Sequence, residues 1–82
     1  MSEASVKQEN ARLVLKAAVA EAAGVSEVFL YRERVMKRAN IADVEAFWEM
    51  ADYLAERRYI IEGSPDYWTF AVTSRGTLEA AR

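Results

Sequence analysis

Apolar residues recur with helical spacing near the start of the chain. A stripe at i, i+3, i+4 spacing, typical of a buried helix face, consists of Ala11, Val14, Leu15, Ala18, Val19 and Ala22. Ser5 and Gln8 have the separation that the capping box of a helix start requires. Gly24 follows the stripe, where many helices end in a left-handed residue that favours glycine. The pattern predicts a helix over residues 6–23.

Residues 25–41 have a pattern that fits two kinds of element. VSEVFLY contains several strand formers and predicts a short strand near residues 28–31. Alternatively, Ser26 caps one continuous helix. The apolar stripe of that helix would consist of Val28, Tyr31, Val35 and Ala39. Both interpretations contain a helix over residues 32–39 that ends at Asn40, and the sequence leaves its start open.

A further helix and a hairpin follow. The helix is predicted over residues 42–57, with Asn40 as its N-cap. Its apolar face consists of Val44, Phe47, Trp48, Ala51, Leu54 and Ala55. RYIIE and YWTFAVT have the β-branched and aromatic composition of strands, and the turn residues GSPD at 63–66 join them. Thr73 is expected to cap a short last helix, SRGTLEAAR.

The residues around the hairpin resemble a pattern found in bacterial regulators. They are Leu54, Tyr59, Ile60, Tyr67, Val72, Thr73 and Gly76. Their order is similar to L-x3-G-Y-I, a wing, then L-T-x-x-G in MarR-like and PadR-like proteins, and the resemblance covers residues 32–82. It implies an α+β fold, a mostly helical winged helix-turn-helix with three helices, a two-stranded antiparallel wing and a short C-terminal helix. Arg58 stands where the pattern has glycine, so we expect that turn to be built differently.

Composition limits the chain to one small domain. It has 82 residues, of which 52% are hydrophobic and 29% charged, as in an ordinary folded domain. We expect a single winged-helix domain over residues 1–82, with residues 1–5 disordered. The N-terminal MSEASVKQEN is polar and does not resemble a signal peptide. The absence of cysteine fits a reducing compartment, so we expect a cytoplasmic protein.

Catalysis and metal binding find little support in the residue types. Histidine and cysteine are both absent, which excludes zinc fingers, disulfides and proton transfer by imidazole. Glu45 and Glu49 are carboxylates one turn apart, but they lie opposite the apolar face of their helix, in water. The glycines are too dispersed for a phosphate-binding loop. We expect no enzymatic activity, no cofactor and no bound metal.

Basic residues favour a role in binding duplex DNA. They are concentrated in RERVMKR and at the end of the third helix: Arg32, Arg34, Lys37, Arg38, Arg57 and Arg58. In a winged helix such positions reach phosphates, which receive most protein–DNA hydrogen bonds. The resemblance also implies a homodimer and a role in transcription regulation. We therefore expect a small bacterial or phage regulator that binds DNA phosphates through this basic patch.

The third helix favours a different partner. The second helix of a helix-turn-helix normally enters the major groove, and here it would bring carboxylates against phosphates. The net charge of −2 adds no general attraction to nucleic acid. The alternative is a protein–protein interaction module with a basic partner. Its contact residues would be Glu45, Ala46, Glu49, Met50, Tyr53, Glu56 and Trp68.

Overall fold

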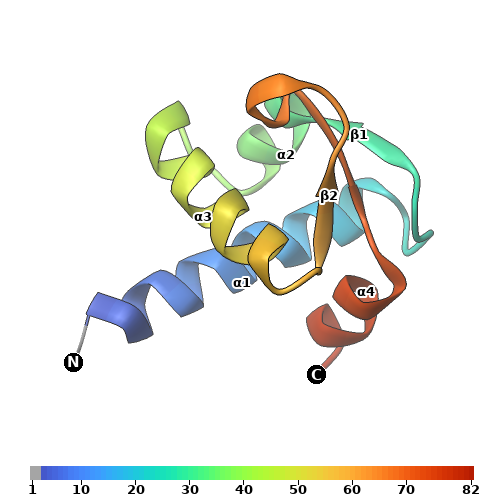
Figure 1. Cartoon of the computed structure of the whole chain (residues 1–82), viewed down its shortest axis with the longest axis horizontal. Coiled ribbons are helices and arrows are strands. Elements are labelled where there is room, and N and C mark those ends of the chain that lie inside the picture. The colour runs from blue at the N-terminus through green and yellow to red at the C-terminus, as the bar shows by residue number, and fades with distance from the viewer. Residues whose placement is uncertain (1–2) are drawn as a thin grey trace.

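The longest helix, α1 (Glu3–Glu21), contacts each of the other α-helices (Figure 1). The computed structural model describes residues 3–82, with side chains from Gln8 onward. The predicted stripe of α1 is confirmed, because all its members are buried except Val19, which is partly buried. The helix begins before Ser5, which is therefore not its N-cap, and includes residues 3–5, which we expected to be disordered. Residues 1–2 of that prediction lie outside the described part of the chain.

The end of α1 is a left-handed turn in which alanine, not glycine, has the C′ position. Ala23 has φ 53°, and its N–H donates to the carbonyl of Ala20 at 3.1 Å. Gly24 has φ 78°, and its N–H donates to the carbonyl of Val19 at 3.0 Å. This pair of hydrogen bonds defines a Schellman motif with Ala23 at C′, one residue earlier than predicted.

The ambiguous segment forms both a strand and a helix. β1 (Phe29–Tyr31) is followed directly by α2 (Arg32–Arg38), and Asn40 ends α2 with φ 59°. β1 has the alternation of a half-buried strand, because Leu30 is buried and both its neighbours are exposed. The continuous helix capped by Ser26 is therefore not formed. The sheet has a third strand in addition to the two-stranded wing that we expected.

α3 (Val44–Glu56) buries the predicted apolar face. Phe47, Ala51 and Leu54 are buried, and the other members of that face are partly buried. The N-cap is Asp43, whose carboxylate accepts a hydrogen bond from the N–H of Glu45 at 3.0 Å. Asn40 does not cap α3, because it lies three residues before Asp43 and ends α2 instead.

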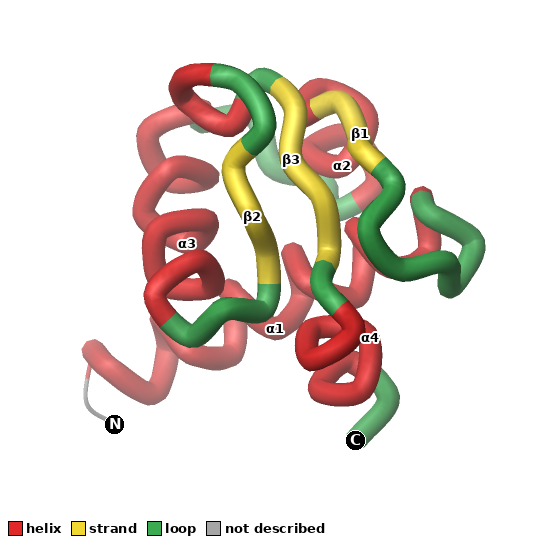
Figure 2. The backbone as a smooth tube through the Cα atoms, turned by 45° about the vertical axis from the view of Figure 1, so that its right-hand side comes forward, coloured by secondary structure: helices red, strands yellow, loops and turns green. Residues whose placement is uncertain are grey.

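Three antiparallel strands form one sheet in the order β1-β3-β2 (Figure 2). β2 (Ile60–Glu62) and β3 (Thr69–Val72) form the predicted hairpin, and β1 pairs with the other edge of β3. Residues 63–68 join the hairpin strands and contain the 3-10 turn η1 (Pro65–Tyr67), so β3 begins two residues later than predicted. In Figure 2 the helices lie behind or beside the sheet, and none of the described helices crosses its outer face.

The turn between α3 and β2 is also a Schellman motif. The N–H of Arg58 donates to Ala55 and that of Tyr59 donates to Leu54, both at 3.0 Å. Arg58 has φ 63°, so arginine occupies the left-handed position in which the regulator pattern has glycine. Our expectation of a differently built turn is therefore wrong. The contacts of β2 and α3 compensate the unfavourable conformation of this residue.

Gly76 lies at a contact that has no room for a larger residue. An added Cβ would lie 2.1 Å from the carbonyl oxygen of Tyr59 and 2.9 Å from Cγ1 of Val72. Thr73 caps α4 (Ser74–Ala80), as predicted, because its hydroxyl accepts from the N–H of Gly76 at 3.0 Å. The N–H of Thr73 also donates to the Tyr59 carbonyl at 3.0 Å. These contacts give a structural reason for threonine at position 73 and glycine at position 76 of this chain.

The core lies between the inner face of the sheet and the helices. Phe47 of α3 and Phe70 of β3 are both fully buried, with ring centroids 5.9 Å apart. No helix within residues 3–82 has the length and hydrophobicity needed to span a membrane.

Candidate interaction surfaces

Three of the predicted basic residues lie together on α2, next to an acid from α1. Arg34 and Arg38 form ion pairs with Glu21 at 3.5 and 3.2 Å. Lys37 lines the same shallow hollow and is exposed. Glu21 was not included in our sequence analysis of this patch, because it lies at the end of another helix. Its carboxylate lowers the positive potential of the patch and competes with any phosphate for both arginines.

Arg32 is engaged elsewhere, at the loop between β2 and β3. Its Nη1 donates to the backbone carbonyl of Asp66 at 3.0 Å, and its guanidinium lies 5.2 Å from the ring centre of Trp68. Its Nε is buried and has no hydrogen-bond partner among the described residues. Arg32 therefore makes its contacts within the domain.

The remaining two predicted cations lie at the far end of α3. Arg57 stacks on the ring of Tyr53, 3.5 Å from its centre, and donates to the backbone carbonyl of the same residue at 3.2 Å. Arg58 is exposed next to it. Arg75, which we had not considered, stacks on Tyr59 at 5.7 Å. The six predicted nucleic-acid contacts are thus distributed over three environments.

The loop over residues 63–68 is held against α2 and α3. The Asp66 carbonyl accepts hydrogen bonds from Arg32 and from the indole Nε1 of Trp48, the latter at 2.9 Å. The hydroxyl of Tyr67 donates to the carboxylate of Asp52 at 2.7 Å. Asp66 and Tyr67 both have positive φ, near 59°, a costly conformation that these contacts stabilise. Burial, followed by the nearby Asp52 carboxylate, raises the pKa of Tyr67 above its ordinary range.

The outward side of α3 has one acid more than the predicted set of contact residues. Its exposed residues form one row, named here the acidic face of α3: Glu45, Glu49, Asp52 and Glu56. We did not include Asp52 among the contact residues, although its i+3 spacing from Glu49 places it on this row. Only one ion pair is found for these four residues among the described side chains, a contact of 3.9 Å between Glu56 and Arg57.

The three apolar contact residues that we predicted beside these acids, Ala46, Met50 and Tyr53, are largely covered. Met50 is buried, and Ala46 and Tyr53 are partly buried against the core. The physical reason is that α1 packs along this side of α3. Met50 is therefore a core residue and not a contact residue. Of the predicted interaction residues, Glu45, Glu49, Glu56 and Trp68 are exposed.

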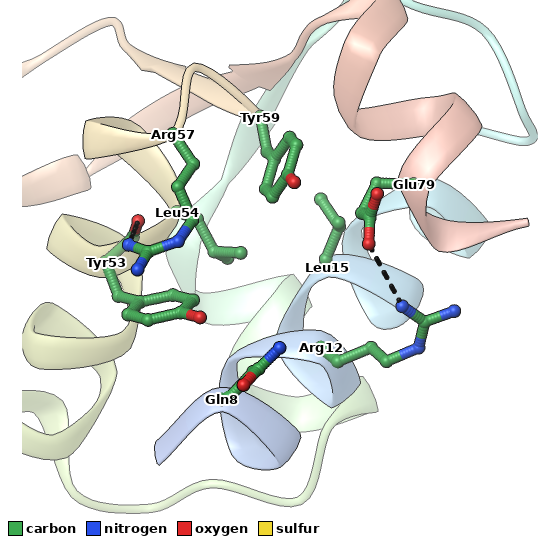
Figure 3. A pocket seen from close by; sticks show the side chains of 8 residues that line it. All are labelled: Gln8, Arg12, Leu15, Tyr53, Leu54, Arg57, Tyr59 and Glu79. Carbon is green, nitrogen blue, oxygen red and sulfur yellow. Dashed lines mark hydrogen bonds and ion pairs between the residues drawn. The ribbon is translucent and has the colours of Figure 1, made fainter. Parts of the chain in front are cut away.

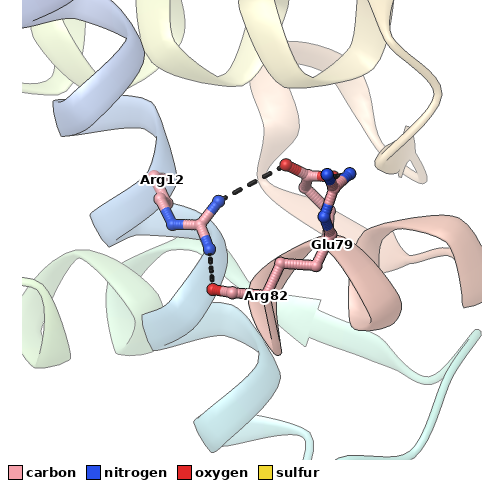
Figure 4. Close-up of polar contacts among 3 residues, drawn as sticks. All are labelled: Arg12, Glu79 and Arg82. Atoms are coloured by element: carbon pink, nitrogen blue, oxygen red, sulfur yellow. Dashed lines mark hydrogen bonds and ion pairs between the residues drawn. The ribbon is translucent and has the colours of Figure 1, made fainter.

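A small pocket lies where α1, α3 and α4 meet (Figure 3). It has a volume of about 90 Å³, with Leu15 and Leu54 among its lining residues and Tyr53 and Tyr59 on one side. Such a volume accommodates a few water molecules. Arg12 lines another side and pairs with Glu79 at 3.3 Å (Figure 4). The same guanidinium donates to the backbone carbonyl of Arg82, so its hydrogen-bonding groups serve to attach α4 to α1.

Apolar side chains on the outer face of the sheet form a surface that the sequence indicated only in part. Phe29, Tyr31, Ile61 and Trp68 are all exposed. The alternation of β1 could have revealed it, because an inward Leu30 requires two outward aromatic neighbours. We considered only Trp68 as a contact residue.

The described side chains contain no group of three or more acids that is arranged to hold a metal ion. Comparisons with protein-family models, curated proteins and solved structures find no match to this chain.

Proposed function

We propose that this chain is a non-catalytic winged-helix domain that binds a basic partner protein through the acidic face of α3. The observation that carries this proposal is the row of four exposed carboxylates on the helix that a DNA-binding member would insert into the major groove. Charge complementarity selects partners mainly by excluding surfaces of the same sign. Phosphates are excluded by this face, and a surface rich in lysine or arginine is favoured.

The fold supports the winged-helix part of the proposal. Two helices joined by a short link, α2 and α3, precede the hairpin of β2 and β3. The second strand of this hairpin, β3, also pairs with β1, which precedes α2. The order of α2, α3 and the hairpin is the one that the resemblance implies. The hairpin loop is attached to Asp52 and Trp48 of α3, so that loop and acidic face form one rigid surface.

A charge-reversal experiment tests the proposed contact. The probe is a fluorescent helical peptide with lysines at i, i+4 spacing, titrated at about 50 mM salt, where charge contacts are weakly screened. Glu45→Lys with Glu49→Lys should weaken its binding by about tenfold or more. The matched control is Glu27→Lys with Glu33→Lys, which changes net charge equally at two exposed acids outside α3. Equal loss in both double variants, or no binding by the unchanged protein, would overturn the proposal.

Duplex DNA binding through phosphates is the second candidate. The observation that favours it is the grouping of Arg34, Lys37 and Arg38 on one exposed side of α2. Both arginines are exposed and such ion pairs are weak, so phosphates could replace the partly buried Glu21 as their partner. In this candidate α2 lies along the DNA backbone and α3 stays outside the major groove.

One titration distinguishes the two candidates. A generic labelled duplex is added at about 50 mM and about 200 mM salt, a range over which phosphate-driven affinity falls steeply. Binding that disappears in Arg34→Glu with Lys37→Glu, and strengthens in Glu45→Lys with Glu49→Lys, supports the DNA candidate. Absence of binding at the lower salt rejects it.

A further inference from the structure

The outer face of the sheet has a continuous apolar surface across all three strands. The strand register places Phe29, Ala71 and Ile61 in one row and Tyr31 beside Thr69 in the next. Trp68 extends the second row, because its ring lies edge-on to that of Tyr31 with centroids 6.4 Å apart. The ring of Phe29 reaches across β3, since an added Cβ on Gly63 would lie 2.7 Å from it.

Four neighbouring side chains on this face are exposed together and form one apolar patch. Phe29, Tyr31, Ile61 and Trp68 are 61%, 56%, 49% and 43% exposed. Side chains of this size have on the order of 200 Å² of surface, so together they expose roughly 400 Å². This area is comparable to the largest apolar patch of a typical monomeric protein, and such patches are often functional.

The face is also free of charge. All its outward positions are apolar or carry only a hydroxyl. Of the charged residues beside it, Arg32 binds the Asp66 carbonyl and Glu62 accepts from the N–H of Tyr67 at 3.3 Å, whereas Glu27 is exposed just before β1. The acidic face of α3, in contrast, would repel its own copy.

We propose that the outer sheet face is the contact between two copies of this chain in a two-fold symmetric dimer. A symmetric contact places the same residues on both sides, and a neutral apolar face meets its copy without burying any charge. Two such faces remove roughly 800 Å² of side-chain area from water, less than the 1,200–2,000 Å² of stable complexes. The dimer is therefore weak and reversible, with an expected dissociation constant of about 10 μM to 1 mM. The proposed dimer does not depend on the basic partner protein proposed for the acidic face of α3.

Sedimentation velocity over about 5 μM to 1 mM protein, the range that spans this affinity, tests the dimer. The weight-average sedimentation coefficient of the unchanged protein should rise with concentration toward that of a dimer. Ile61→Lys places a charge on the β2 side of the contact and should keep the protein monomeric. Leu78→Lys is the matched control, because Leu78 is 70% exposed on α4, outside the sheet. It should dimerise like the unchanged protein.

Two further measurements keep the outcome interpretable. The Ile61→Lys variant must retain the circular dichroism spectrum of the unchanged protein. If this variant does not fold, Phe29→Lys is used as the test variant in its place. In a Trp48→Phe background, Trp68 is the remaining tryptophan, and its emission should shift to shorter wavelength as concentration rises. A monomer at all concentrations, or a dimer that survives the charge on the face, overturns the proposal. Loss of the dimer in Leu78→Lys also overturns it.

Discussion

The hydroxyl of Tyr67 donates a 2.7 Å hydrogen bond to the carboxylate of Asp52, which joins the hairpin loop to the middle of α3. The phenol is buried, whereas Asp52 is exposed and can also be hydrated. The protonated phenol is therefore the form that the folded state favours. This single contact connects the conformation of the loop to the face that we propose for partner binding.

Tyr67→Phe should lower the free energy of unfolding at neutral pH by about 1 kcal/mol, the typical net contribution of one hydrogen bond. The raised pKa of Tyr67 predicts a pH dependence as well. An unfolded tyrosine titrates near pH 10, so the contribution is complete below about pH 10 and is lost as pH rises further. Denaturant unfolding at pH 8 and pH 11 should show the difference between the two proteins shrinking at the higher pH. If the difference in the free energy of unfolding were the same at both pH values, the raised pKa of Tyr67 would be contradicted.

Tyr31→Phe is the control for that comparison. The Tyr31 hydroxyl has no hydrogen-bond partner among the described side chains, and its ring is largely exposed. Its removal should change the free energy of unfolding by less than about 0.5 kcal/mol at either pH.

Arg58→Gly should stabilise the protein. Arg58 has φ 63°, a conformation that costs an L-residue about 1–2 kcal/mol and costs glycine far less. The larger conformational freedom of glycine in the unfolded chain offsets part of the gain. A net increase of about 0.5–1 kcal/mol is expected in urea unfolding. Arg58→Ala keeps the left-handed strain and should not give this gain, so equal stabilisation by both variants would point to charge instead of conformation.

Gly76→Ala should be strongly destabilising. The new Cβ would lie 2.1 Å from the Tyr59 carbonyl oxygen, and backbone must move to relieve the clash. Overpacking of this kind costs about 1–3 kcal/mol or more. Gly24→Ala is the comparison, since its Cβ would meet nothing within 4 Å and only φ 78° is unfavourable. Thermal unfolding should show a clearly larger loss for Gly76→Ala, and the reverse order would refute the close contact.

Glu21→Gln tests how strongly the α2 cations are held. Removing the carboxylate breaks the ion pairs of Arg34 and Arg38, which lie on the surface. The free energy of unfolding should fall by at most about 1 kcal/mol, and the loss should shrink in high salt. Glu33→Gln removes an exposed acid on α2 that has no ion pair among the described side chains, and it should have no such effect. A large, salt-independent loss would indicate that Glu21 has a role in the core.

Several elements could be predicted because their signals lie within a few neighbouring residues. The stripe of α1 and the apolar face of α3 repeat with the helical period, which is local. Thr73 caps α4 through the N–H three residues ahead, and GSPD breaks the chain between two strand-forming segments. These signals need no information about the rest of the chain, and the corresponding elements are present.

The formation of β1 and the burial of Met50 depend on contacts with residues that are distant in the sequence. VSEVFLY suits strand or helix, and β1 forms because β3, some forty residues later, offers an edge with Phe70 opposite Leu30. Met50 lies on the side of α3 that α1 covers, and the helical period alone does not tell which side a second helix will take.

The sequence by itself determined where helices and turns form and how acidic α3 is, because period, capping and charge are properties of adjacent residues. The tertiary structure decided which charges remain available. It paired the α2 arginines with Glu21 of another helix, and it attached the hairpin loop to α3 through the Asp66 carbonyl and Asp52. Such contacts join residues that are far apart in the chain, and only the packing of the whole domain brings them within hydrogen-bond distance.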